Sequence, residues 1–316
     1  MRILPLLGLL CVLGLPAASQ AQRPASAPTS TEPVTLAVDL AQPIGPMPPV
    51  WAYFGYDEPN YSYMPDGQKL LTELAALSPT PVYVRVHNLL TTGNGEAALK
   101  WGSTNAYSED AQGRPLYDWK IVDRIFDAFV SRGMKPIAQL GFMPEALSTR
   151  PVPYRHYWKP GDPYESIYTG WAYPPKDYQK WGELVYQWVR HCVARYGEAE
   201  VKTWRWELWN EPNIGYWKGT PQEYNQLYDY TEAAVHRALP AALLGGPETT
   251  GPGWNKAADY LRGFLQHCVT GDELRDRQDG YSPRFYFLPC QRWPQARGWP
   301  CAHEYGYAVW RPGRRL

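Results

Sequence analysis

The chain has 316 residues, of which 44% are hydrophobic, and its 31 basic side chains equal its 31 acidic ones in number. That length allows one large domain or two small ones with a full core, and the lack of net charge argues against nucleic acid or an anionic membrane surface as the main partner. Aromatic residues make up 15% of the chain, including 15 Trp and 24 Tyr. Because aromatic faces stack on the apolar faces of sugars, this usage fits a carbohydrate site, and a Trp-rich core accounts for it equally well.

The N-terminal segment has the features of an export signal. Arg2 supplies a positive charge, residues 3–15 form a short apolar run, and Ser19-Gln20-Ala21 offers a small-x-small cleavage site. The run is too short to span a bilayer comfortably. We therefore expect residues 1–21 to be a signal peptide and the product to be secreted or periplasmic. Cleavage beside Cys11, as in a lipoprotein, is the alternative.

The next segment, residues 22–33, is rich in Pro, Ser, Thr and Ala, which predicts a flexible leader. No later stretch is long and apolar enough for a membrane span. The spacing of the five cysteines resembles no zinc site. We therefore expect neither a membrane nor a metal ion among the partners.

Strand-like and helix-like segments alternate through the body of the chain. Residues 81–87 alternate apolar and other side chains with the period of a strand, whereas residues 177–196 place apolar side chains with the period of a helix. Gly197 then ends that helix, and Thr220 followed by Pro221 begins another. In chain order we expect strands over residues 81–87, 135–140, 201–210 and 242–246, and helices over residues 121–129, 177–196, 221–238 and 255–268.

This repeated strand-then-helix order predicts a parallel sheet, either closed into a (β/α)8 barrel or open and doubly wound. No Gly-rich phosphate loop follows the first strand, which weakens the open nucleotide-binding sheet. The long loops over residues 88–117 and 141–176 suit a barrel, whose sites are built from such loops. We therefore predict an α/β fold of the (β/α)8 TIM-barrel class over residues 34–271, incomplete, with about six of the eight strands encoded.

The clearest chemical signal is the run Trp204-Arg205-Trp206-Glu207-Leu208-Trp209-Asn210-Glu211-Pro212. The predicted strand delivers Asn210 and Glu211 at its C-terminal end, where barrel enzymes place catalysis. Shielding by Trp209 and Trp217 would raise the pKa of the Glu211 carboxyl, as a general acid for glycoside cleavage requires. Asn210 can bond a sugar 2-hydroxyl. An exposed turn after a strand is the alternative.

Strand parity adds a second hypothesis. The valines of residues 82–86 point toward the packing helices, so Arg85 and His87 point into the barrel. Glu207 has the same parity as Glu211 and can also point inward. We expect Arg85 and Glu207 to pair inside the barrel and His87 to contact sugar at its mouth. A core histidine bonded to backbone is the alternative for His87.

Four short segments carry a family resemblance. They are Val84-Arg85-Val86-His87, Trp209-Asn210-Glu211-Pro212, Ile214-Gly215-Tyr216-Trp217-Lys218-Gly219 and Gly245-Gly246-Pro247. Together they resemble the family 39 glycoside hydrolases, which include β-xylosidases and, more distantly, α-L-iduronidases. The resemblance extends from about Thr35 to Gly271. Asn-Glu-Pro alone marks the wider clan of such barrels, cellulases included, so the whole set is more specific.

The resemblance implies a retaining glycosidase that needs no metal or organic cofactor. Glu211 matches the family's acid/base carboxyl, Asn210 its substrate-contacting amide and His87 its strand-two histidine. Tyr216 and Trp217, from the segment that follows, are expected to bind substrate. The family's nucleophile is a second Glu on strand seven, and we find no position in this chain that matches it.

The sequence changes character after Gly271. Residues 272–316 contain eight Arg and no Lys, Ile, Thr, Asn or Met. Reading plausible codons from the second base restores these missing types and gives an apolar strand ending in His, which resembles strand six of the family. We therefore predict a shifted reading frame, with one extra base or two missing near the codons for Gly271. A natural disordered tail is the alternative.

The predicted function is hydrolysis, with retention, of β-linked xylosides such as xylo-oligosaccharides. Because a retaining enzyme needs two carboxyls, we expect the chain as written to be inactive or unstable. The alternatives are another glycosidase of the clan (arabinose-releasing enzyme, β-galactosidase or endoglucanase), a non-catalytic sugar-binding protein, and a gene fragment without a role. The expected partner is a carbohydrate, and the oligomeric state is left open.

Overall fold

The computed structural model describes residues 39–42, 45, 47, 49–251, 253–270, 285–286 and 309–310. The predicted signal peptide, the leader and most of the predicted out-of-frame tail lie outside these residues. The chain divides into two compact units, Met1–Pro46 and Met47–Leu316. All helices and strands given below belong to the second unit.

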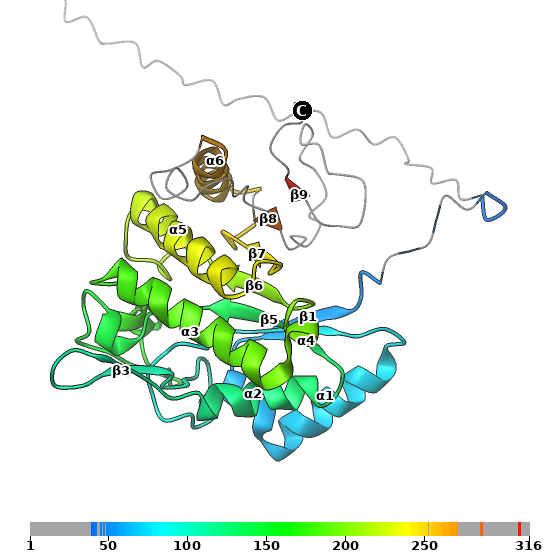
Figure 1. Ribbon diagram of the computed structural model, residues 1–316, viewed down its shortest axis with the longest axis horizontal. Coiled ribbons are helices and arrows are strands. Elements are labelled where there is room, and N and C mark those ends of the chain that lie inside the picture. The colour runs from blue at the N-terminus through cyan, green and yellow to red at the C-terminus, as the bar shows by residue number, and fades with distance from the viewer. Residues whose placement is uncertain are drawn as a thin grey trace, which may run out of the picture. The chain divides into compact units, whose positions relative to one another are not determined.

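One sheet organises the second unit (Figure 1). Its strands, in spatial order, are β1 (Tyr53–Tyr56), β2 (Tyr83–Val86), β5 (Lys135–Leu140), β6 (Arg205–Leu208), β7 (Leu244–Gly245), β8 (Phe285–Tyr286) and β9 (Val309–Trp310). All neighbours from β1 to β8 pair in parallel, and only β8 and β9 pair antiparallel. Since parallel neighbours in chain order are joined by helices, this part of the molecule has the βα repeat of a (β/α)8 barrel, as the sequence predicted.

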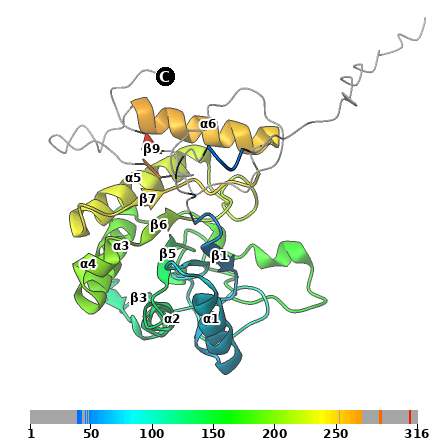
Figure 2. The same cartoon turned by 90° about the vertical axis from the view of Figure 1, so that its right-hand side faces the viewer.

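The helices occupy the connections between these strands. They are α1 (Pro65–Leu77), α2 (Lys120–Val130), α3 (Tyr178–Tyr196), α4 (Glu198–Val201), α5 (Pro221–Ala238) and α6 (Asn255–Thr270). Short 3-10 turns (Pro59–Tyr63, Glu145–Leu147, Tyr164–Ile167 and Gly170–Ala172) and an antiparallel hairpin of β3 (Tyr107–Glu109) and β4 (Pro115–Tyr117) lie in the loops. Both views show α3 lying beside α5 (Figures 1 and 2).

Most predicted elements are confirmed, and β5 and α5 have the predicted bounds. The strand predicted over residues 201–210 is wrong at its start. Gly197 adopts φ 84°, which lets the chain turn into α4, and the strand begins only at Arg205. β1, α1 and the β3–β4 hairpin were not predicted from the sequence. Among the residues of α1 only Leu71 is buried, so that helix carries a weak apolar stripe.

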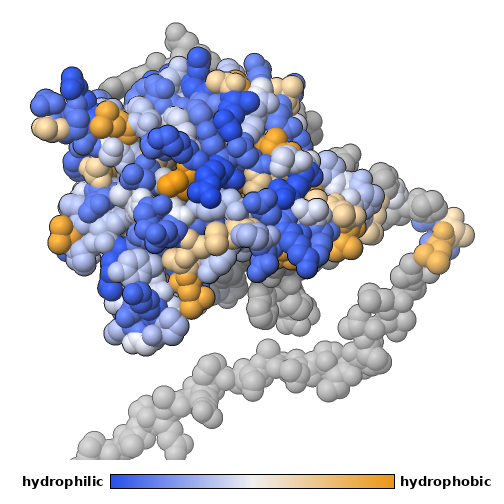
Figure 3. Space-filling model, turned by 90° about the horizontal axis from the view of Figure 1, so that it is seen from below, coloured by the Kyte–Doolittle hydropathy of each residue, from blue (hydrophilic) through white to orange (hydrophobic). Residues whose placement is uncertain are grey.

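The core confirms the predicted strand parity. Val84 and Val86 are fully buried in the hydrophobic cluster, whereas Arg85 between them belongs to the opposite face. The apolar stripe of α3 is buried as predicted, and it consists of Trp181, Leu184, Val185 and Trp188. The face in Figure 3 is mainly hydrophilic, with apolar residues only in small separate groups. No helix within the described ranges is both long and apolar enough to cross a membrane.

We predict that Thr220→Ala destabilises the fold by about 1 kcal/mol. The Thr220 hydroxyl accepts a hydrogen bond from the Glu223 N–H at 3.1 Å, and the Glu223 carboxylate accepts one from the Thr220 N–H at 2.7 Å. The substitution leaves a donor of the first turn of α5 without its capping partner. Urea unfolding measures the change, and the exposed Thr72 gives a control as Thr72→Ala. Equal effects of the two substitutions would contradict the capping role.

Candidate active site

An ion pair lies inside the barrel between β2 and β6. The guanidinium Nε of Arg85 donates to both carboxylate oxygens of Glu207, at 2.9 and 2.8 Å, and its Nη2 also bonds Glu207. The Glu207 side chain is 2% exposed and that of Arg85 is 19% exposed. The predicted pairing of Arg85 with Glu207 is therefore confirmed.

The same guanidinium orients two predicted substrate-binding residues. Its Nη2 donates to the Asn210 Oδ1 at 3.0 Å, which turns the amide nitrogen of Asn210 away from Arg85. Its Nη1 bonds the His87 Nε2. Arginine can only donate, so Nε2 of His87 accepts and the ring proton sits on Nδ1. Burial and then the positive charges of Arg85 and Lys100 hold the pKa of His87 well below its usual value, so the ring is neutral.

Glu211 lies just beyond the end of β6 and faces this group. It is half-buried, and its φ of 45° is in the left-handed region. Its N–H donates to the Glu248 carbonyl oxygen at 2.6 Å, which ties the residue to the end of β7. Burial raises the pKa of Glu211, the positive charges of Arg85 and Lys100 oppose this rise, and the charge of Asp57 adds to it. The carboxyl thus stands among the converging strand ends, partly shielded from water.

Left-handed backbone is concentrated around this site. Asn88, Lys100, Trp101, Trp209 and Glu211 all have φ between 45° and 71°, and each follows β2 or β6 in the chain. This conformation is unfavourable for bulky side chains, at about 1–3 kcal/mol each, and occurs most often where function requires it. The strain marks the C-terminal edge of the sheet as the functional edge.

The two aromatic residues predicted to bind substrate belong to one aromatic wall, which also contains Trp101, Phe142 and Trp209. Tyr216 is 6% exposed, interacts electrostatically with Glu211, and lies with its hydroxyl 3.3 Å from that of Tyr164. Trp217 packs edge-on against Trp209 at 5.1 Å, and its Nε1 donates to the Thr220 carbonyl at 2.9 Å. The indole of Trp217 is thus held within the wall. Direct sugar contact by Tyr216 and Trp217 stays a prediction.

The structure brings three further side chains to this edge. Two of them were not predicted from the sequence, and the third, Glu248, was expected either to line the site or to have an ordinary structural role. Asp57 follows β1, Lys100 lies in the loop after β2, and Glu248 follows β7. Each interacts electrostatically with Glu211. Asp57 was not predicted because β1 was not identified as a strand. Its position directly after a strand is the sequence feature that would have indicated it.

Glu248 is a carboxyl that stays protonated near neutral pH. Burial and the negative charge of Glu207 raise its pKa to about 8, against the positive charge of Arg85. We predict that Glu248→Gln flattens the dependence of stability on pH between about pH 4.5 and 8. The folded state binds the proton more tightly than the unfolded chain, so stability falls as pH rises through this window.

The size of this effect is at most about 1.4 kcal/mol per pH unit, the value for one whole proton. Urea unfolding at several pH values across the window measures the slope for wild type and Glu248→Gln. The exposed Glu145 gives a matched control as Glu145→Gln, which should keep the wild-type slope. If Glu248→Gln also keeps that slope, Glu248 is ionised in the folded protein.

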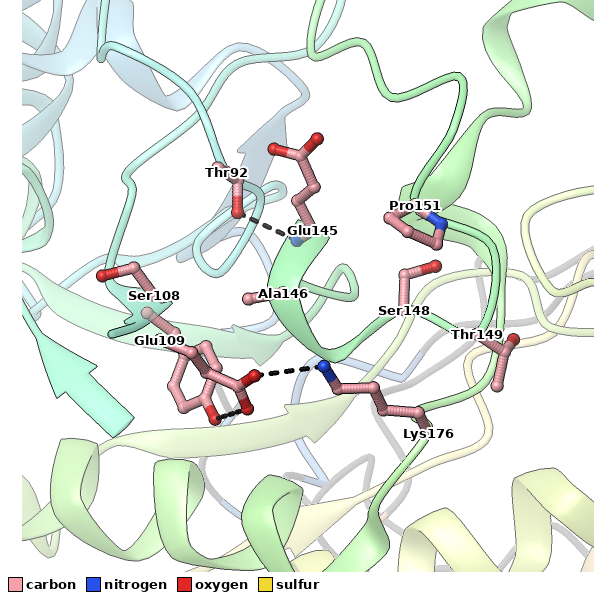
Figure 4. Close-up of a pocket in the computed structure, with 10 residues that line it drawn as sticks. Thr92, Ser108, Glu109, Glu145, Ala146, Ser148, Thr149, Pro151 and Lys176 are labelled. Carbon is pink, nitrogen blue, oxygen red and sulfur yellow. Dashed lines mark hydrogen bonds and ion pairs between the residues drawn. The ribbon is translucent and has the colours of Figure 1, made fainter. Parts of the chain in front are cut away.

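A second hollow lies away from Glu211, with a cavity volume of about 630 Å³ (Figure 4). Several of its polar groups already have partners. The Glu145 N–H donates to the Thr92 hydroxyl at 2.9 Å, and the Lys176 ammonium pairs with Glu109 at 3.1 Å. The charges of Lys176 and Glu109 in this hollow are therefore paired with each other. In the part of the chain that the structure covers, no cluster of His, Cys, Asp and Glu is placed to hold a metal ion.

Comparison with known proteins gives a consistent set of relatives. The model of Glycosyl hydrolases family 39 matches residues 34–281. The chain is 35% identical over 192 residues to the β-xylosidase of Geobacillus stearothermophilus. The aligned region covers 59% of this chain and 33% of that protein. It is 24% identical over 252 residues to the α-L-iduronidase of Mus musculus, covering 76% and 34%. This chain therefore spans about a third of the length of these curated relatives.

Solved structures of β-xylosidases and of a GH39 enzyme are also similar to this chain. The monomeric β-xylosidase from Caulobacter crescentus CB15 matches with a TM-score of 0.53 and 30% identity, over 68% of this chain and 38% of that one. The GH39 enzyme from Xanthomonas axonopodis pv. citri matches with a TM-score of 0.51 and 28% identity, over 67% and 38%.

Proposed function

Because the chain belongs to glycosyl hydrolases family 39, we propose that it hydrolyses β-linked xylosides with retention of configuration and that Glu211 is the acid/base. The observation that carries this proposal is the placement of Glu211. Its carboxyl is half-buried, has a raised pKa, and lies at the C-terminal edge of the sheet next to Asn210. The β-xylosidase relatives support xylosides, while the α-L-iduronidase relatives keep a uronide as the second candidate substrate.

The chemistry assigned to Glu211 has two steps. The protonated carboxyl first donates to the glycosidic oxygen, so that the leaving group departs as an alcohol while a second, ionised carboxyl forms a bond to the anomeric carbon. The resulting Glu211 carboxylate then takes a proton from the water that attacks the anomeric carbon, and the bond from that carbon to the second carboxyl breaks. Asn210, oriented by Arg85, is proposed to donate from its amide nitrogen to the sugar 2-hydroxyl.

Retention requires a nucleophile, which is a second, ionised carboxyl about 5–5.5 Å from the acid/base carboxyl. Glu248 does not suit this role, because its raised pKa keeps it protonated near pH 7. We therefore propose that the nucleophile is encoded downstream of Gly271 in another reading frame. Sequencing the gene there tests it, and an intact frame would end it. Export by the N-terminal signal also stays a proposal.

The test of the function is a panel of aryl glycosides assayed on the frame-corrected protein. The expected result is fastest turnover of the β-xyloside, with β-xylose as the first product seen by NMR. Faster turnover of an arabinoside, β-galactoside, β-glucoside or α-L-iduronide would move the assignment to that substrate. Xylobiose binding without any turnover, retained in Glu211→Gln, would instead indicate a sugar-binding protein.

A further inference from the structure

Two side chains leave the sheet together at the edge that carries Glu211. Tyr56 of β1 pairs in register with Val86 of β2, so the next residues, Asp57 and His87, emerge side by side. The His87 Nδ1 lies 3.6 Å from the Asp57 Oδ1, which is beyond hydrogen-bond length. A gap of this size between a donor and an acceptor can be bridged by a hydroxyl that accepts from one and donates to the other.

His87 supplies the donor of this pair. Its Nε2 accepts a hydrogen bond from Arg85, so its proton is on Nδ1. The side chain is 5% exposed, and Nδ1 is buried with no hydrogen-bond partner among the described residues. A buried donor without a partner is costly. A ligand hydroxyl at this point would remove the cost.

Lys100 supplies a second donor on the other side of Asp57. Its ammonium lies 3.0 Å from the Asp57 Oδ2, and about a third of each side chain remains exposed. The ammonium also lies 5.0 Å from the ring centre of Trp101, which is 1% exposed and packed into the aromatic wall. Both Lys100 and Trp101 have left-handed backbone. Strained backbone therefore holds this ammonium at the C-terminal edge of the sheet.

We propose that His87, Asp57 and Lys100 form a subsite that binds two adjacent hydroxyl groups of a neutral sugar next to Glu211. One hydroxyl accepts from the His87 Nδ1 and donates to Asp57. Its neighbour donates to Asp57 and accepts from Lys100. This inference rests on the proposed function, because it places the sugar beside the carboxyl assigned as acid/base.

The charges favour a neutral sugar over an acidic one. The ammonium of Lys100 is already paired with Asp57, and the guanidinium of Arg85 is already paired with Glu207. The carboxyl of Glu58 also interacts with Lys100. Among the charged groups described around Glu211, neither cation is left to pair with a sugar carboxylate.

The experiment is calorimetric titration of the full 316-residue chain with xylobiose. Asp57→Asn and Lys100→Met keep the shape of each side chain and remove its charge. Each should raise the Kd for xylobiose by about 10- to 100-fold, the effect of losing a hydrogen bond to a charged group. Lys120→Met is the matched control, because Lys120 forms an exposed pair with Asp118 at 3.4 Å and should leave the Kd unchanged.

Deoxy sugars then identify the contact. Methyl β-xyloside derivatives lacking one hydroxyl should bind the wild type more weakly, and the hydroxyl that contacts Asp57 should lose its effect in Asp57→Asn. If both variants bind xylobiose as the wild type does, the subsite is wrong while the proposed function stands. If the wild-type chain itself fails to bind xylobiose, the subsite is wrong, and the xyloside proposal is decided separately by the aryl-glycoside panel on the frame-corrected protein. Tighter binding of methyl β-D-glucuronide, lost in Lys100→Met, would make this an anion site and overturn the inference.

A second pair of variants separates binding from folding. Lys100→Gly removes the ammonium but relieves the left-handed backbone, so its melting temperature should stay at or above that of the wild type while xylobiose binding weakens. Asn105→Gly relieves the same strain at an exposed position of the same loop and should keep full binding. Equal binding by the two glycine variants would overturn the role of Lys100.

Discussion

Glu211→Gln is expected to lower kcat for xylobiose by about 10²- to 10⁴-fold in the frame-corrected protein, the usual contribution of a general acid–base residue. The amide has the same shape but can neither donate the proton to the leaving oxygen nor accept one from water. Aryl xylosides with acidic leaving groups need less protonation, so their cleavage step should lose less. Steady-state kinetics on both substrates measure the difference.

The pH profile gives a second readout of the same variant. Glu211 must be protonated to donate, and its pKa is raised by burial. Activity of the wild type should therefore fall as pH rises through the pKa of Glu211, and Glu211→Gln should lose this alkaline limb. Glu145→Gln, at an exposed position in the second hollow, is the control and should keep both rate and profile. Wild-type rates in Glu211→Gln would remove it from the mechanism.

Arg85→Ala is expected to destabilise the 316-residue chain by about 3 kcal/mol, the lower end of the range for breaking a buried ion pair. The lower end applies because the Arg85 side chain is 19% exposed and partly screened, although Glu207 at 2% is not. The loss strands the Glu207 charge and leaves His87 and Asn210 without their shared donor. For a domain of this size the melting temperature should fall by about 6–12 °C.

A double-mutant cycle tests whether the loss comes from the stranded charge. Arg85→Met combined with Glu207→Leu removes both charges, and it should recover most of the stability that either substitution alone loses. Arg195→Ala is the surface control. It breaks the pair with Asp127 at 2.6 Å, where both side chains are well exposed, and should cost less than about 1 kcal/mol. An unchanged melting temperature in Arg85→Ala would refute a structural role for the pair.

Local pattern was sufficient for much of the fold and for the centre of the site. Caps at Thr220 and Gly197 and the apolar stripe of α3 placed helices correctly, because these signals act between residues close in the chain. Strand parity placed Arg85 and Glu207 on one inner face, because successive side chains of a strand alternate. Local pattern also predicted the strand that ends before Asn210 and Glu211.

Only the tertiary structure decided which strand ends meet. β1 has the sequence Tyr-Phe-Gly-Tyr, which shows no alternation of apolar and polar side chains, so the sequence did not place Asp57 at the edge of a sheet. Its position beside His87 comes from the pairing of β1 with β2, a contact between segments 30 residues apart in register. The protonation of Glu248 likewise depends on burial next to Glu207, which no local pattern encodes. A sequence fixes the elements through short-range preferences, whereas charge, burial and hydrogen bonding at a site follow from long-range packing.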